Sequence, residues 1–131
     1  MEVMNMSEQA QPAVTIKKSF ATPDEVRNPP KARVEVVNLG DVQAMRATFE
    51  PGWKWSESVK PIAGTDSCQV AHLGYQISGR LTVRMDDGTE YQFGPGDACA
   101  IPPGHDAWVV GNEPVVLIDF QGAAIYAKPT T

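Results

Sequence analysis

The side chains best able to bind a metal ion are few in this chain, which has two histidines, His72 and His105, and two cysteines, Cys68 and Cys99. Neutral imidazole and thiolate are ligands that suit zinc, iron and copper. His105 follows the turn Pro102-Pro103-Gly104 at a predicted strand entrance, and the mouths of β-barrels are common places for sites. Two cysteines do not make a disulfide framework, so we interpret both as thiols.

Glycine and proline turns divide the rest of the chain into short strands. The runs Gly94-Pro95-Gly96-Asp97 and Pro102-Pro103-Gly104 would each break a helix, and Asp87-Gly88 is a strong hairpin signal. Between such turns the sequence predicts strands over 14–20, 32–39, 42–49, 68–78, 80–85, 90–93, 98–101, 106–110 and 115–121. Many short strands at this spacing predict an all-β jelly-roll barrel.

Length, charge and hydropathy limit the class of protein. The 131 residues are enough for one domain, so we expect a mobile tail over 1–12 and a single barrel domain over 13–131. The net charge of −5, with no basic run longer than Lys17-Lys18, argues against a nucleic-acid partner. We find no signal peptide and no apolar run of the ~20 residues that a membrane span needs, and we therefore expect a cytoplasmic protein without a membrane partner.

Two glycine-bounded segments together resemble the paired sequence signature of the cupin superfamily. Gly96, Pro102 and Gly104 match the glycine, proline and glycine of the second signature, and Gly79 corresponds to the glycine that closes the first. The resemblance covers the chain from Trp53 to Phe120 and implies the cupin jelly roll, also called a double-stranded β-helix barrel.

The resemblance also indicates where metal ligands belong, and this chain departs from it at every such position. His72 stands where cupins usually have a glutamate, and Cys68 and Asp66 stand where they usually have histidines. Ala107 replaces the remaining histidine. A site inherited unchanged from the family is therefore not expected here.

Strand periodicity predicts which side chains share the interior of the barrel. The resemblance places His72 inward, and the period of two then turns alternate residues of the same segment inward with it: Cys68, Val70, Gly74 and Gln76. The resemblance also places Ala107 inward, and the same period of two then turns His105 inward. We therefore predict that the two imidazoles converge across the barrel.

Converging imidazoles leave two interpretations open. A cluster of Asp66, Cys68, His72 and His105 would supply four ligands to a divalent transition metal such as zinc, iron or manganese. Alternatively, each polar group forms a hydrogen bond in or near the cavity without a metal. Gly74, at an inward position, suggests that space is left for a ligand.

The segment between Trp53 and Asp66 is longer than its counterpart in cupins and is predicted to form a lobe at the mouth of the barrel. Trp53 and Trp55 are two residues apart and share a face if this segment is extended. Their side chains would then either form the base of a ligand site or fill one end of the barrel by packing. Glu57 follows them in the same lobe and is a further pocket candidate.

The function favoured by the sequence is binding of a small molecule in the barrel cavity. The residues predicted to line that pocket are His72, His105, Gln76, Cys68, Trp53, Trp55 and Glu57. Two alternatives remain: a metal-dependent enzyme of the oxygenase or isomerase type, and a non-catalytic structural or regulatory module with a filled barrel and an exposed apolar patch. We also expect a homodimer, with the predicted strand Val14–Phe20 as a candidate pairing edge.

Overall fold

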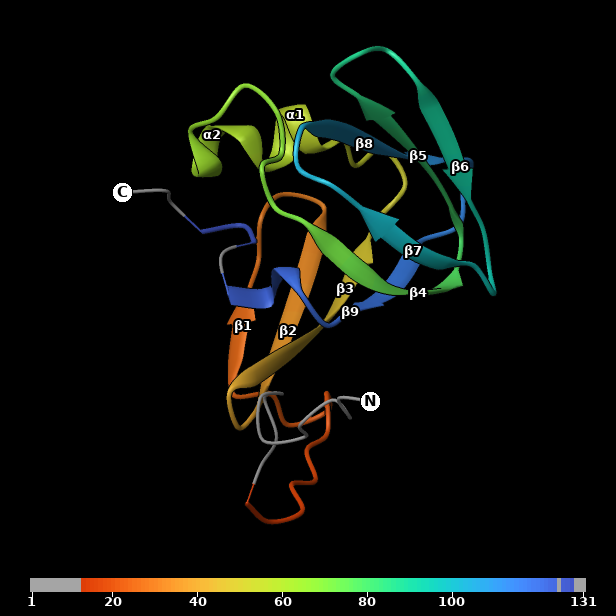
Figure 1. Cartoon of the computed structure of the whole chain (residues 1–131). Coiled ribbons are helices and arrows are strands. Elements are labelled where there is room, and N and C mark those ends of the chain that lie inside the picture. The colour runs from red at the N-terminus through yellow and green to blue at the C-terminus, as the bar shows by residue number, and fades with distance from the viewer. Residues whose placement is uncertain (1–12, 125, 129–131) are drawn as a thin grey trace, which may run out of the picture.

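The computed structural model describes residues 13–124 and 126–128, and its main element is a six-stranded antiparallel sheet. The strands lie in the order β1-β2-β3-β9-β4-β7 (Figure 1). Their bounds are β1 Glu25–Arg27, β2 Ala32–Leu39, β3 Val42–Phe49, β9 Val115–Asp119, β4 His72–Ser78 and β7 Ala98–Ile101. The predicted N-terminal tail, 1–12, lies outside the described residues.

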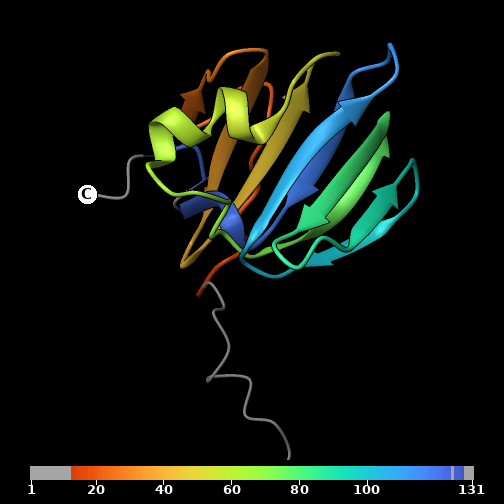
Figure 2. The ribbon, with the colours of Figure 1, turned by 90° about the horizontal axis from the view of Figure 1, so that it is seen from above.

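A second, three-stranded antiparallel sheet faces the first and completes the barrel. Its order is β6-β5-β8, with β6 Glu90–Phe93, β5 Arg80–Met85 and β8 His105–Val110. Seen from above, the two sheets enclose the interior between them (Figure 2). The prediction of an all-β jelly-roll barrel is confirmed.

The core fills the space between the sheets because apolar residues alternate along the strands. Val34 and Val36 of β2 pair with Ala47 and Met45 of β3, and all four side chains are buried. Leu81 and Val83 of β5 close the core from the opposite sheet.

The lobe before β4 is helical. Its two one-turn helices are α1, Trp55–Ser58, and α2, Lys60–Ala63, and α2 ends at Gly64 in the left-handed conformation. Figure 2 shows both helices on the side of β2 and β3, away from β6. The predicted lobe is therefore present beside the barrel, and it is helical rather than extended.

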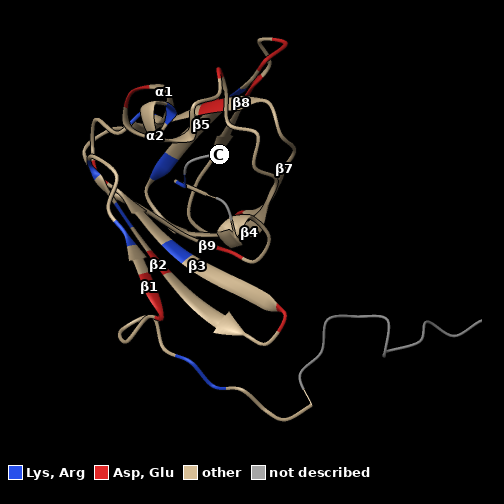
Figure 3. Cartoon of the chain, turned by 90° about the vertical axis from the view of Figure 1, so that its left-hand side faces the viewer, with Lys and Arg blue, Asp and Glu red and all other residues tan. Residues whose placement is uncertain are grey.

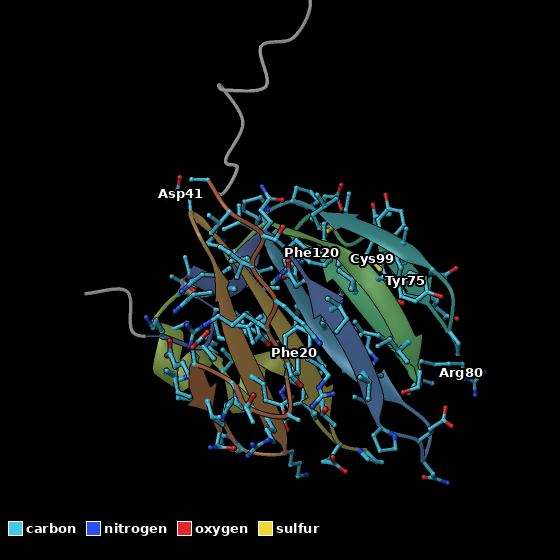
Figure 4. All side chains as sticks on the ribbon, turned by 90° about the horizontal axis from the view of Figure 1, so that it is seen from below. Phe20, Asp41, Tyr75, Arg80, Cys99 and Phe120 are labelled. Atoms are coloured by element: carbon cyan, nitrogen blue, oxygen red, sulfur yellow. The ribbon has the colours of Figure 1, made fainter. Side chains whose placement is uncertain are left out.

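The prediction of a strand over Val14–Phe20 is wrong. These residues form no strand in the structure, and β1 occupies the edge of the sheet beside β2. The segment instead crosses the outer face of the sheet, where Phe20 lies against the Arg46 guanidinium, with 5.4 Å between that group and the ring centroid (Figure 4). Asp24 ends this crossing by accepting the backbone N–H of Asn38 at 2.7 Å.

No helix among the described residues is long and apolar enough to span a membrane.

Candidate metal centre

The turn at Pro102-Pro103-Gly104 joins the start of β8 to the segment that carries Cys68. The backbone N–H of Cys68 donates to the carbonyl of His105 at 2.7 Å, and the N–H of Gly104 donates to the carbonyl of Cys68 at 2.7 Å. Gly104 adopts a φ of +94°, a conformation that glycine tolerates best. This short bridge fixes the Cys68 and His105 side chains next to each other.

His72 completes the cluster from the first residue of β4. Its Nε2 lies 3.8 Å from the Cys68 Sγ, and the centroids of the His72 and His105 rings are 5.3 Å apart. One ligand atom from each of the three residues lies within 4.8 Å of the others. The predicted convergence of the two imidazoles is therefore observed.

The Nδ1 atom of each imidazole faces a hydrogen-bond acceptor. Nδ1 of His72 lies 2.5 Å from Oδ2 of Asp119, and Nδ1 of His105 lies 2.9 Å from the carbonyl oxygen of Pro102. A carboxylate and a carbonyl can only accept, so in the neutral rings the proton resides on Nδ1. Nε2 of each ring then carries a free lone pair, which is the form that binds metals.

Asp119 is itself held rigidly at the end of β9. Its side chain is fully buried, and its Oδ1 accepts backbone N–H groups from Leu73, Gln121 and Gly122. A Cβ at Gly122 would lie 2.9 Å from both the Asp119 Oδ2 and the His72 Nδ1, so only glycine leaves this contact undisturbed.

Burial determines the protonation of the cluster in the absence of a cation. Burial raises the pKa of the Cys68 thiol to about 11. The pKa of His105 is lowered to about 4, mainly by burial and secondarily by the neighbouring His72. Burial alone would raise the pKa of Asp119, but hydrogen bonds from His72 and the backbone hold it below its ordinary value. At neutral pH the cluster thus has a thiol, a neutral His105 and an ionised Asp119.

A small cavity of about 50 Å³ adjoins the cluster inside the barrel. His72 and His105 contribute to its wall, which is otherwise mainly apolar and aromatic. Trp53, which stacks on Phe49 with 3.9 Å between ring centroids, and Trp55 of α1 both line it. Both tryptophans are buried and belong to the core of the barrel.

Three of the predicted site residues lie elsewhere. Asp66 is exposed in the loop after α2 and is not part of the ligand cluster. Glu57 is exposed on α1, because the helical turn directs it away from the face that buries Trp55.

Gln76 does face inward and is fully buried, but it lies four residues along β4 from His72, about 13 Å away. Its amide donates to the carbonyls of Gly79 and Phe93 and does not line the cavity.

Gly74 lines the cavity, but strand packing is what requires glycine there. A Cβ at this position would lie 1.9 Å from the backbone oxygen of Ile118 in β9, because β4 and β9 approach closely.

Two residues of the site were missed by the sequence analysis. Asp119 is the lone charged residue in the apolar strand β9, on the inward side of Val115 and Leu117, and that isolated inward charge was an available signal. Tyr126 lies after the last strand, and its ring lies 5.5 Å from that of His72. No local pattern marks it.

Comparisons with known proteins agree with this architecture. No family model and no curated protein matches the sequence. Among solved structures, a protein of unknown function from Rhizobium leguminosarum bv. viciae 3841 aligns with a TM-score of 0.60 and 22% identity, covering 82% of this chain and 96% of that one.

Two further structures name the fold. An RmlC-like cupin from Shewanella frigidimarina NCIMB 400 aligns with a TM-score of 0.53 and 17% identity, covering 77% of this chain and 86% of that one. A cupin-like protein from Thermotoga maritima aligns with a TM-score of 0.50 and 18% identity, covering 69% and 67%. The chain has the cupin fold. At these identities the likeness concerns the fold of the cupin barrel and not its activity.

Proposed function

We propose that this cupin barrel binds one transition-metal ion through Cys68, His72 and His105, and that a small molecule meets the ion in the adjoining cavity. The observation that carries the proposal is the gathering of three ligand residues around one point. Both Nδ1 atoms are committed to acceptors, and one ligand atom each of Cys68, His72 and His105 lies within 4.8 Å of the others. The Cys68 thiol lies within hydrogen-bond distance of the His72 Nε2, and a cation that displaces the thiol proton would bind all three residues together.

The spacing of the three atoms supports a metal site. Zinc lies about 2.0–2.3 Å from nitrogen and sulfur ligands, which places tetrahedral ligands about 3.3–3.7 Å apart. The Cys68 Sγ and the His72 Nε2 are 3.8 Å apart, close to that separation, and all three ligand atoms lie within 4.8 Å of one another, so binding requires the side chains to move inward. The carboxylate of Asp119 behind His72 and the carbonyl of Pro102 behind His105 are the outer partners that metal-binding histidines usually have.

The donor set favours zinc over manganese, because thiolate and imidazole are softer ligands than the oxygen atoms that manganese prefers. Three protein ligands leave one position open in a tetrahedral zinc site. When bound there, the ion would supply a Lewis acid to a molecule in the cavity. The presence of a cavity supports this proposal over a module that acts only through its surface, for which a filled barrel is expected.

Titration of untagged, metal-stripped protein with Co²⁺ and Zn²⁺ tests the proposal. We expect one ion per chain and, with Co²⁺, a near-ultraviolet band from thiolate coordination. Cys68→Ser should remove that band and weaken zinc binding by more than about 100-fold. Cys99→Ser is the matched control, because Cys99 lines the same cavity but lies outside the cluster.

Two results would refute the metal site. One is the absence of stoichiometric binding by the wild-type protein. The other is a Cys68→Ser variant that binds zinc as tightly as the Cys99→Ser control.

A further inference from the structure

A buried arginine on the edge strand β1 holds the C-terminal part of the chain. Arg27 is only 8% exposed, and its Nη1 donates to the carbonyl oxygens of Ala123 and Tyr126 at 2.7 Å each. Its Nε and Nη2 donate to the carboxylate of Glu25 at 2.8 and 3.2 Å. A buried charge is costly unless it is paired and hydrogen-bonded, and bonds from a charged donor are stronger than neutral ones. The guanidinium therefore ties two carbonyls that lie 96 and 99 residues further along the chain to β1.

These carbonyls belong to the segment that packs around His72 and Asp119. We call residues 122–124 and 126–128 the C-terminal segment. Residues Gly122–Ala124 form a 3₁₀ turn whose first N–H donates to Oδ1 of Asp119 at 3.1 Å. The Tyr126 ring meets the His72 ring edge to face, with 5.5 Å between centroids, and the Tyr126 N–H donates to the first carbonyl of the turn at 3.0 Å. The guanidinium on β1 thus acts on both residues through the groups that contact them.

The backbone beyond Tyr126 adopts a conformation that needs such a hold. Ala127 has a φ of +57°, in the left-handed region that residues with a Cβ rarely occupy. Such conformations persist where surrounding contacts determine them, and they are frequent at clamps and switch regions. The Tyr126 carbonyl that Arg27 binds belongs to the peptide group that enters Ala127. Loss of this bond should therefore release the bend.

A second cavity adjoins both the C-terminal segment and the metal cluster. It measures about 210 Å³, and Cys68 and residues 126–128 contribute to its wall. The wall also includes the exposed residue Gln69, so the cavity reaches from the surface to the buried Cys68. An ion needs a passage to the cluster, because Cys68 and His105 are both buried. Outward movement of the C-terminal segment widens this passage, and local opening of this kind requires no global unfolding.

We infer that Arg27 is a positioning residue of the proposed metal site, which holds the C-terminal segment against His72 and Asp119 and so slows exchange of the ion. This inference rests on the proposed function and concerns the regulation of that same site. With the hold in place, Tyr126 limits rotation of the His72 ring and covers the cavity beside Cys68. Without it, the segment opens more often and the ion leaves faster.

Release of zinc into an excess of a chromophoric chelator tests the inference, with the rate taken where it no longer depends on chelator concentration. Arg27→Met keeps the apolar stem and removes the donors, so it should release zinc about tenfold faster than wild type or more. Arg27→Lys, whose ammonium can still donate to the carbonyls, should restore slow release. Arg33→Met is the matched control, because Arg33 on β2 pairs with Glu35 in place of the C-terminal segment.

Alkylation of the metal-free protein by iodoacetamide gives a readout that does not depend on zinc. Mass spectrometry follows Cys68 and Cys99 in the same molecule. Arg27→Met should speed the reaction of Cys68, whose cavity the C-terminal segment covers, and leave that of Cys99 unchanged. A general loss of stability would instead speed both reactions.

The outcomes separate the two proposals. Absence of stoichiometric zinc binding by the wild-type protein would overturn the proposed function and this inference together. Zinc binding with equal release rates in Arg27→Met and Arg33→Met, release from Arg27→Lys as fast as from Arg27→Met, or equal acceleration of both cysteines would overturn the inference alone. If Arg27→Met does not fold, Glu25→Gln takes its place, because it weakens the support of the guanidinium from its other side. Release from Glu25→Gln no faster than from Arg33→Met would likewise overturn the inference.

Discussion

At the scale of single residues, Asp119 governs whether His72 can act as a ligand. Its Oδ2 accepts from Nδ1 of His72, while three backbone N–H groups hold its Oδ1. This arrangement fixes both the orientation of the ring and the tautomer with a bare Nε2. Asp119 does not contact the proposed ion, so we regard it as a positioning residue.

Asp119→Asn should weaken zinc binding by about 10- to 100-fold. The amide can still offer its oxygen to the backbone donors, but its NH₂ group then faces His72 and favours the tautomer that protonates Nε2. Competition with a chromophoric chelator measures the affinity, and imidazole ¹⁵N shifts of the metal-free protein report the tautomer. Asp97→Asn, at an exposed turn, is the control, and unchanged affinity with the Nδ1–H tautomer retained would contradict this role.

At the scale of elements, the close approach of β4 to β9 places His72 beside Asp119. Gly74 pairs with Asp119 across the two strands, and Leu73 accepts the N–H of Phe120 at 2.8 Å. The missing side chain at Gly74 permits this spacing. Packing of two strands, not space for a ligand, therefore explains the glycine.

Gly74→Ala should destabilise the barrel by about 1–3 kcal/mol or more, because the added Cβ would lie 1.9 Å from the Ile118 backbone oxygen. Urea unfolding followed by fluorescence measures the free energy of unfolding. Gly94→Ala is the matched control, since a Cβ there meets nothing within 4 Å. Equal urea midpoints of unfolding for the two variants would contradict this prediction, because they would show that β4 and β9 can move apart without loss of stability.

The strands and the inward residues were predictable because both depend on local pattern. Strands 32–39, 42–49, 80–85, 90–93 and 98–101 have the predicted bounds, since turns with glycine or proline delimit them. Alternation likewise placed His72 and His105 inward. The strand predicted over 68–78 begins only at His72, and Cys68 is held in the cluster by its isolated bridge to His105. The segment 14–20 has an equally strand-like pattern but lies on the outer face of the sheet, where Phe20 contacts Arg46, and β1 is the strand that pairs with β2.

The remaining parts of the site depend on contacts between distant segments. Asp119 is 47 residues from His72, and Tyr126 follows the last strand, so no spacing within either segment connects them. Asp66 was assigned from the ligand positions that the cupin resemblance implies, and Glu57 from its place after the two tryptophans in a loop whose course the sequence does not fix. The bend after α2 and the turn of α1 leave both exposed.

At the scale of the whole molecule, charge and apolar surface lie on different parts of the large sheet. Charged side chains concentrate on β1, β2 and β3, whereas β4 and β7 contain none (Figure 3). The outer face near β4 instead exposes a row of large apolar residues, about half-exposed each: Leu73, Tyr75, Ile77 and Phe120. Tyr75 and Phe120 can be followed on this face in Figure 4. We call this row the outer apolar face.

We propose that a second copy of the chain covers the outer apolar face, since monomeric proteins rarely leave such a contiguous patch open. A two-fold contact brings the same patch of each copy together, and an uncharged apolar surface is complementary to itself. The homodimer expected from the sequence is retained on this basis, although the edge strand first suggested for it does not form.

Light scattering at micromolar concentration should therefore report twice the chain mass of 14.2 kDa.

Ile77→Glu should convert the protein to a monomer, because each copy would place a carboxylate in the apolar contact, where burying an unpaired charge is costly. Zinc stoichiometry should be unchanged, since Ile77 faces away from the barrel interior and is 48% exposed. Tyr91→Glu, a similarly exposed position on β6 of the other sheet, should remain a dimer. A monomeric wild-type protein, or dimers that persist in Ile77→Glu, would remove the outer apolar face as the site of pairing.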